Sequence, residues 1–229
     1  IAARENRQWK PAVSYCRYAD DFVVVVKGTH AHAEAIREAC RTFLEGQLKL
    51  TLKMEKTHIT HVNDGFVFLG HRIIRKRGPR GHLRPVTTIP WEKYRGFTDK
   101  LVKELSGNYS VNRMDLMESL NRTLSGWANF YQYTDYTATV LSRVDRTVFW
   151  KLGHWLARKY RRGFPSLMRE HVRAPEPGRA TTWVLKGQNS RGWYGEQALR
   201  RLVTSRKGQF RCRNPDGNHY LIRDEHRTF

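Results

Sequence analysis

The sequence predicts an α+β fold: an antiparallel sheet with a helix, then a three-helix bundle, then a small basic C-terminal region. Three observations support this prediction. Short β-branched and aromatic runs occupy the first third of the chain, apolar residues recur at steps of three and four from about residue 90, and proline and glycine cluster after residue 162. We therefore expect three domains, at residues 1–88, 89–162 and 163–229.

Residues 12–27 have the pattern of two strands joined by a tight turn. The run Phe22–Val26 contains four consecutive valines, which is typical of a strand buried on both faces. A helix is expected over residues 31–48, where apolar side chains share one stripe, and it would cover a face of a single sheet. Further strand segments are expected at residues 50–52, 58–62 and 65–70, and a basic hairpin at residues 71–84.

Three helices are expected between residues 90 and 160. Pro90 suits the first turn of the first helix, Gly107 ends that helix, and Asn112 is a suitable N-cap for the second. The third helix should run from about Thr137 to Tyr160. Short breaks between the three helices favour a small helical domain.

The third predicted helix has two different faces. One face should pack in the bundle, and it carries Val140, Val144, Val148, Leu152 and Leu156. The opposite face carries Arg143, Arg146, Trp150, His154 and Arg161. That face is either a solvated basic surface or a phosphate-binding stripe with an interleaved aromatic side chain. The overall charge and the exposure expected for Trp150 favour the phosphate-binding interpretation.

The last third of the chain is expected to be less regular. Residues 163–180 contain several prolines and glycines and are interpreted as a linker. The remaining expected elements are a strand at residues 181–185, a short helix or strand at 196–204 and a hairpin between 209 and 222.

The charge of the chain points to a polyanionic partner. Its 229 residues include 42 lysines and arginines against 21 acidic residues, a formal net charge of +21. Such a charge argues against cationic substrates and favours nucleic acid. The basic residues are concentrated in three stretches of the chain: six lie in residues 71–84, eight in 151–180 and eight in 200–229.

The three cysteines, Cys16, Cys40 and Cys212, are far apart and form no Cys-x-x-Cys pair. We therefore expect ordinary thiols of an intracellular protein, and neither a zinc site nor a disulfide framework. The apolar runs are too short to span a membrane, so no membrane partner is expected. We expect a bacterial cytoplasmic protein associated with the nucleoid, with an organelle as the alternative location.

Asp20 and Asp21 are adjacent acids between two apolar strands. Two carboxylates forced together repel each other, and a bound divalent cation removes that cost. Mg²⁺ binds carboxylate and phosphate oxygens, and a pair of such ions can stabilise phosphoryl transfer. A polar hairpin turn without any metal is the alternative, since aspartate is common in turns.

The order of several motifs resembles the group II intron reverse transcriptase/maturase family. Tyr18-Ala19-Asp20-Asp21, followed by the valine strand, is similar to the Y-A-D-D box of reverse transcriptases. Residues 55–57 and 65–70 resemble later palm motifs, the last of which forms the primer grip in that family. Residues 120–131, which include Gly126 and Trp127, are similar to the thumb, or maturase, signature. The resemblance covers about residues 13–162 and is loose beyond them.

The resemblance implies a right-hand polymerase fragment, with the C-terminal half of the palm at residues 1–88, the thumb or maturase domain at 89–162 and a nucleic-acid-binding tail at 163–229. Asp20 and Asp21 would be catalytic and would bind Mg²⁺ in a two-metal site completed by an aspartate outside this chain. Lys56 would act beside the triphosphate; a plain surface lysine is the alternative.

The other implied site residues fall into two groups. Primer and nucleotide would contact Tyr18, Ala19, Phe68, Leu69 and Gly70, although residues 68–70 could equally be a plain core strand. RNA would contact Arg75, Lys76, Arg77, Arg143, Arg146, Trp150, Arg158, Lys159, Arg161 and Arg162. Gly126, Trp127 and Tyr131 are interpreted as packing within the thumb.

The function implied is RNA-directed DNA synthesis combined with binding of intron RNA to assist splicing and mobility. The implied partners are intron RNA, an RNA template, a DNA primer or target, dNTP and the missing N-terminal half of the polymerase. Without fingers and the third aspartate, these residues alone should not polymerise. The alternatives are a non-catalytic RNA-binding splicing cofactor and a related defence- or CRISPR-associated reverse transcriptase. Asp216, His219, His226 and Cys212 do not form a credible endonuclease metal set.

Overall fold

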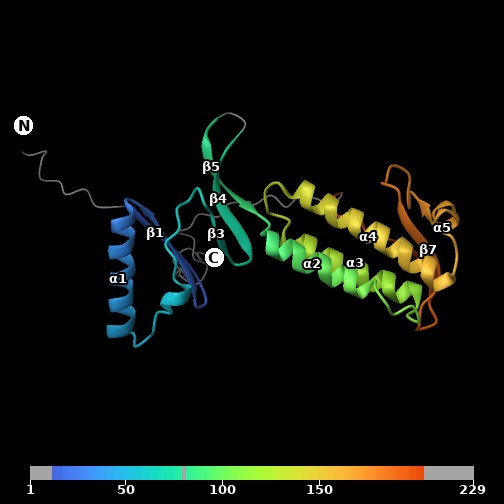
Figure 1. Cartoon of the computed structure of the whole chain (residues 1–229), viewed down its shortest axis with the longest axis horizontal. Helices are drawn as coiled ribbons and strands as arrows, with labels where there is room; N and C mark the ends of the chain where they lie inside the picture. The colour runs from blue at the N-terminus through green and yellow to red at the C-terminus, as the bar shows by residue number, and fades with distance from the viewer. Residues whose placement is uncertain (1–11, 79–80, 204–229) are drawn as a thin grey trace, which may run out of the picture. The chain divides into compact units, whose positions relative to one another are not determined.

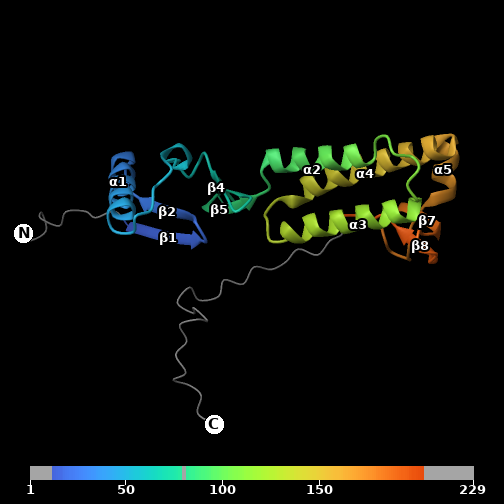
Figure 2. The same ribbon diagram turned by 90° about the horizontal axis from the view of Figure 1, so that it is seen from below.

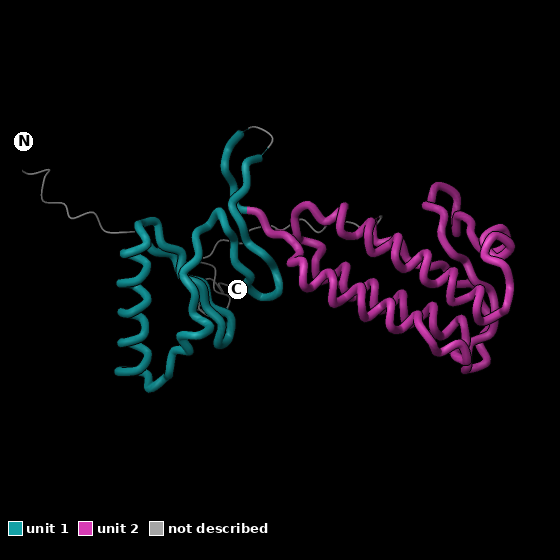
Figure 3. Tube along the Cα trace, viewed as in Figure 1, with its two compact units in different colours: residues 1–85 teal, residues 86–229 magenta. Residues whose placement is uncertain are grey.

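The computed structural model describes residues 12–78 and 81–203. It divides the chain into two compact units, residues 1–85 and 86–229 (Figure 3). Each unit mixes helices with antiparallel strands, which agrees with the α+β class expected from the sequence. The hairpin expected between residues 209 and 222 lies outside the described residues.

The first unit begins with the hairpin expected at residues 12–27. Strands β1 (Ala12–Tyr18) and β2 (Asp21–Lys27) pair antiparallel, and the pair Tyr18–Asp21 closes the turn. Helix α1 (His30–Gly46) follows and is drawn beside β1 in Figure 1. Thr29 caps this helix, because its hydroxyl accepts from the N–H of His32 while the His32 ring accepts from the N–H of Thr29.

The sequence predicts a single sheet in this part of the chain. The described residues form two separate sheets instead. Strands β3 (Phe66–Phe68), β4 (His71–Arg77) and β5 (Leu83–Thr88) form a second sheet in the order β3-β4-β5. The predictions of a basic hairpin at residues 71–84 and a strand within 65–70 are thereby confirmed. The strands expected at 50–52 and 58–62 are wrong, because that stretch holds only a short 3-10 helix, η2 (Met54–Lys56).

The prediction that the valine strand is buried on both faces is also wrong for the described structure. Val23, Val24 and Val26 are half-buried, and Val25 is 49% exposed. The described residues do not cover both faces of this two-stranded sheet, so its valines keep contact with solvent.

The second unit is built on three long helices. These are α2 (Trp91–Glu104), α3 (Arg113–Phe130) and α4 (Thr137–Tyr160), which lie side by side in Figures 1 and 2. Asn112 caps α3, since its side-chain oxygen accepts from the N–H of Met114 at 2.8 Å. The expected packing face of α4 is confirmed for Val144, Val148, Leu152 and Leu156, which are all buried, whereas Val140 is half-buried.

Residues 163–203 extend the core of this unit. Helix α5 (Phe164–His171) occupies part of the expected linker, with Pro165 in its first turn. Strands β6 (Val172–Arg173), β7 (Thr182–Gln188) and β8 (Tyr194–Ala198) form a third antiparallel sheet. The linker was expected because proline and glycine often mark loops, yet proline is also favourable at a helix start.

The core of the second unit joins the helices to the third sheet. Trp155 on α4, Leu167 on α5 and Trp183 on β7 are each at most 1% exposed and belong to one apolar cluster with the α2 and α3 side chains. Gly153 permits this packing, since a Cβ there would lie 2.4 Å from the Phe164 ring and 2.5 Å from the Trp183 ring. The unit is therefore a helical bundle with the β6-β7-β8 sheet packed against one end of its core.

Candidate functional site

The acidic pair sits at the tip of the β1–β2 hairpin. Ala19 and Asp20 form the two-residue loop between the paired residues Tyr18 and Asp21. Ala19 has φ of 53°, in the left-handed region that a residue with a Cβ seldom adopts, and the Nε of Arg17 donates to its carbonyl at 2.5 Å. The chain thus holds a strained backbone where the two carboxylates are presented, which is a frequent property of functional sites.

Both carboxylates of this pair are available. Asp20 and Asp21 are exposed, and their carboxylates make no hydrogen bond or ion pair with any other described residue. Adjacent hard oxygen donors on a tight turn suit Mg²⁺, which prefers carboxylates and usually retains several waters. Within residues 12–78 and 81–203, no group of three or more His, Cys, Asp or Glu side chains gathers around them. The pair therefore fits as part of a metal site and requires further ligands.

Lys56 lies on a separate short element. It ends η2, where the N–H groups of Lys56 and Thr57 donate to the carbonyls of Lys53 and Met54 at 3.0 and 3.1 Å. The side chain is exposed. The turn fixes the backbone of Lys56 and leaves its ammonium in solvent.

Residues 68–70 form a tight turn and not a plain strand. Phe68 ends β3 and pairs with His71, so Leu69 and Gly70 make a two-residue loop. Their φ angles are 48° and 78°, as a type I′ hairpin turn requires. Phe68 is half-buried, whereas Leu69 is exposed at the tip.

Strand β4 carries the first basic group. The Nε of Arg75 donates to Asn63 Oδ1 at 2.9 Å, and Arg72 donates to the Asp64 carbonyl at 2.8 Å. Lys76 and Arg77 follow on the same strand and are exposed. The loop before β3 is therefore held against a strand that presents several cations to solvent.

The second basic group lies on the solvent face of α4, as the helical spacing predicted. Arg143 and Arg146 are exposed, and the Arg143 guanidinium lies 6.0 Å from the centre of the Trp91 ring. Trp150 is 46% exposed and stacks on Phe164, with ring centres 5.3 Å apart and planes 17° apart. Cations and an aromatic platform therefore share one helix face.

The basic residues at the end of α4 are mostly engaged within the chain. Arg158 donates to the Tyr109 hydroxyl, which raises the pKa of its guanidinium. Lys159 donates to the carbonyls of Tyr109 and Val111 at 2.7 and 2.8 Å. Arg162 pairs with Glu170 at 2.7 Å and lowers the pKa of that carboxyl. These contacts fix the loop before α3 and the end of α5, so the cations are ordered.

Arg161 has a different position. It follows Tyr160 as the C-cap of α4 with a left-handed φ of 51°, and its backbone N–H donates to the Arg158 carbonyl at 3.4 Å. Its side chain is exposed.

Two sequence comparisons bear on these groups. A sequence profile described as reverse transcriptase (RNA-dependent DNA polymerase) matches residues 2–73, which include the acidic turn. A second profile, described as group II intron, maturase-specific domain, matches residues 95–173, which include the basic face of α4. The chain belongs to the group II intron reverse transcriptase/maturase family.

Three curated proteins are similar to parts of this chain. Protein YkfC of Escherichia coli is 68% identical over 100 residues, which are 44% of this chain and 26% of YkfC. The group II intron-encoded protein LtrA of Lactococcus lactis is 40% identical over 72 residues, which are 31% of this chain and 12% of LtrA. A putative COX1/OXI3 intron 2 protein of Saccharomyces cerevisiae is 32% identical over 79 residues, 34% of this chain and 8% of that protein. The chain matches only about a quarter, or less, of each relative.

The segment that resembles the maturase signature, residues 120–131, packs largely as expected. Trp127 stacks on Phe97, with ring centres 4.5 Å apart and planes 3° apart, and Tyr131 is 4% exposed. Gly126 differs, because it is exposed and nothing lies within 4 Å of the position of a Cβ. The expectation that Gly126 serves packing is therefore wrong, whereas that for Trp127 and Tyr131 is confirmed.

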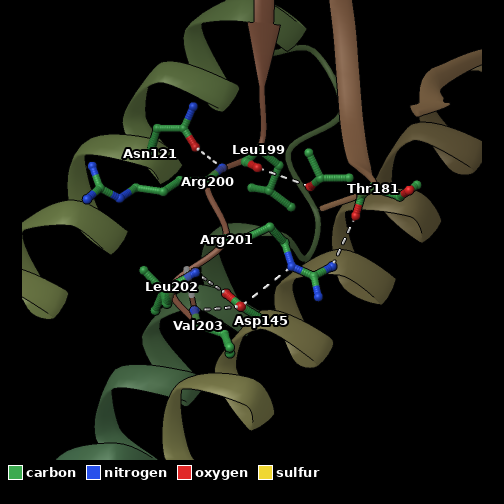
Figure 4. A network of polar contacts seen from close by, with 9 residues as sticks. Asn121, Asp145, Thr181, Leu199, Arg200, Arg201, Leu202 and Val203 are labelled. Atoms are coloured by element: carbon green, nitrogen blue, oxygen red, sulfur yellow. Dashed lines mark hydrogen bonds and ion pairs between the residues drawn. The ribbon is translucent and has the colours of Figure 1, made fainter. Parts of the chain in front are cut away.

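The sequence did not predict that the side chains of Asn121 and Asp145 hydrogen-bond to the backbone of residues 198–203 (Figure 4). Asn121 accepts from the N–H of Arg200 at 2.8 Å. It also donates to the carbonyl of Ala198 at 2.8 Å. Asp145 accepts from the N–H groups of Leu202 and Val203. One signal was available, since Asp145 is an acid beside Val144 on the face of α4 expected to be buried.

No helix among residues 12–78 and 81–203 is both long enough and apolar enough to cross a membrane.

Proposed function

We propose that this chain supplies the acidic turn of a reverse transcriptase palm and the RNA-binding thumb of a group II intron-encoded polymerase. The observation that carries the proposal is the pairing, in one chain, of an available Asp20–Asp21 turn inside the reverse transcriptase match with a basic helix face inside the maturase-specific match. The reaction is RNA-templated DNA synthesis, in which a primer 3′-hydroxyl attacks the α-phosphate of a dNTP and releases pyrophosphate.

In this proposal Asp20 and Asp21 hold Mg²⁺ together with an aspartate from outside the described residues. The bound metal would neutralise phosphate charge and lower the pKa of the attacking hydroxyl. Lys56, whose ammonium is in solvent, is proposed to neutralise the leaving pyrophosphate. The Leu69–Gly70 turn is proposed to support the primer backbone, with Tyr18 and Ala19 beside the primer end.

The basic groups on β4 and α4 are proposed to hold nucleic-acid backbone. Arg143, Arg146 and Arg161 are exposed, and the Arg146 guanidinium has no hydrogen bond or ion pair with another described residue. Arginine binds phosphate strongly because its planar guanidinium can donate two parallel hydrogen bonds. The domain boundaries proposed for these roles are residues 1–88 for the palm part, 89–162 for the thumb and 163–229 for the nucleic-acid-binding tail.

Primer extension on an RNA template tests the polymerase role, using the complete protein that carries this sequence. We expect Asp20→Asn and Asp21→Asn each to lower the extension rate by at least about a thousandfold, since each removes a ligand charge from the metal. Asp99→Asn, an exposed acid on α2, is the matched control and should retain the wild-type rate. Normal extension by the double variant Asp20→Asn/Asp21→Asn would refute the polymerase assignment.

The splicing-cofactor role is a second candidate, favoured by the maturase-specific match. If binding alone supports it, Asp20→Asn/Asp21→Asn should still bind intron RNA and promote splicing. Replacing Arg143 and Arg146 with glutamine should weaken both. Splicing that is lost in the aspartate variant, although RNA binding is intact, would argue against a role by binding alone.

A further inference from the structure

An open pocket of about 460 Å³ lies on the second unit, between α4, α5 and the end segment of the described chain. Phe149, Trp150, Met168 and Val172 form its apolar part. Ser142, Arg146, Thr181 and Arg201 form its polar part. Among the described residues, the lining contains two arginines and no acid, so this part of the pocket combines an apolar surface with positive charge.

From this lining we propose that the pocket binds one unpaired nucleotide of a single strand or loop, with its base on Trp150 and its phosphate at Arg146. This inference rests on the proposed RNA-binding role and specifies which nucleic-acid structure this surface selects. A base inside a duplex is covered by its neighbours, whereas an unpaired base can stack on an aromatic side chain.

Trp150 is held ready for stacking. Its ring already stacks on Phe164, and the Phe149 ring meets it edge-on, with centres 5.6 Å apart. These contacts fix the ring, and it still keeps 46% exposure while it lines the pocket. A platform fixed in advance loses little conformational entropy when a ligand binds.

The two arginines have different roles. Arg146 is exposed, and its guanidinium has no hydrogen bond or ion pair within the described residues, so it is available for a phosphate. Arg201 is held at the pocket wall, 3.5 Å from Asp145 Oδ2 and 3.4 Å from the Thr181 carbonyl. The Asp145 carboxylate faces Arg201 and the backbone N–H groups of Leu202 and Val203, and its residue is only 4% exposed. The charge that a ligand meets is therefore positive.

The test compares RNA hairpins that differ at one position: fully paired, with an unpaired uridine bulge, and with an abasic bulge. We expect wild type to bind the uridine bulge about tenfold more tightly than the other two, which is the stacking contribution of one base. DNA hairpins of the same sequences are measured in parallel, and the comparison shows whether the bound nucleotide belongs to an RNA or a DNA strand. Affinity is measured by fluorescence anisotropy at fixed salt.

Substitutions then locate the preference. Trp150→Ala should abolish it, and Trp150→Tyr should retain most of it, while Trp193→Ala, at another exposed tryptophan, should leave it intact. Arg146→Gln should weaken binding of the bulge more than Arg122→Gln does, although each removes one charge; Arg122 is exposed and paired with Glu118. If Trp150→Ala does not fold by circular dichroism, Trp150→Tyr and Arg146→Gln carry the comparison.

A photocrosslink supplies an independent measurement. With 5-iodouridine in the bulge, we expect the crosslink on the tryptic peptide of residues 147–151, which contains Phe149 and Trp150. A crosslink elsewhere, or a bulge preference unchanged in Trp150→Ala, would overturn the proposal. Equal binding of all three hairpins would also overturn it and leave the proposed RNA-binding role standing, whereas the absence of any salt-dependent binding would remove that role as well.

Discussion

The Asp145 carboxylate, on α4, accepts a hydrogen bond of 2.8 Å from the backbone N–H of Leu202, which lies 57 residues further along the chain. The same carboxylate accepts from the N–H of Val203 at 3.2 Å. Burial is the main influence on this group and raises the pKa of Asp145 above its usual value. One buried acid thus fixes the segment that carries Arg201 to the pocket.

Replacing Asp145 should destabilise the second unit. Asp145→Ala leaves two backbone N–H groups without their acceptor, and we expect the free energy of unfolding to fall by about 2 kcal/mol. Asp145→Asn keeps one acceptor and should cost about 1 kcal/mol. Urea unfolding monitored by circular dichroism measures both, with the exposed Asp99→Asn as the control. If Asp145→Ala were as stable as wild type, these two hydrogen bonds would contribute nothing to the free energy of unfolding.

Two glycine substitutions should act in opposite directions. Gly153→Ala places a Cβ within 2.5 Å of two rings, so we expect a loss of about 1–3 kcal/mol from overpacking. Gly126→Ala adds a methyl group to an exposed helix position with nothing within 4 Å and should add about 0.5–1 kcal/mol. Thermal unfolding of the two variants separates these effects. If Gly126→Ala lowered stability, the α3 helix would require glycine for a reason that its surroundings do not show.

Stability of the second unit should depend on His171 at mildly acidic pH. Burial is the largest influence and lowers the pKa of His171 below the ordinary histidine value of 6.5. Below pH about 6.5 the unfolded chain therefore binds a proton that the folded chain does not, so stability falls as the pH drops toward the lowered pKa. We expect the melting temperature of His171→Gln to decrease less than that of wild type between pH 7 and pH 5. Parallel curves for the two proteins would contradict this account.

RNA affinity should depend strongly on salt through the exposed face of α4. Replacing Arg143, Arg146 and Arg161 with glutamine should reduce the slope of log K against log salt by about 2 to 3, because each phosphate contact contributes about 0.7–0.9. The matched control replaces Arg41, Arg122 and Arg179, which are exposed and paired with glutamates. Equal slopes in the two triple variants would show that position on α4 does not matter.

Local patterns predicted much of the second unit. The helical period placed α4 at Thr137–Tyr160, and a capping side chain located the start of α3 at Asn112. Such features depend on neighbours within one helical turn, so the sequence contains them directly. The strands expected at residues 50–52 and 58–62 failed because short apolar runs become strands only where another strand offers its backbone.

The sequence by itself determined the class of fold, the acidic turn at Asp20 and Asp21, and the basic face of α4 with Trp150. Only the tertiary structure decided which cations are engaged within the chain: Lys159 is held by two carbonyls, whereas Arg146 remains available beside a pocket. It also decided that residues 164–203 join the helical core through Gly153, Trp183 and Asp145. Composition gives the number of charges, but the folded backbone sets where each donor and acceptor lies, and so which charges are left to meet a ligand.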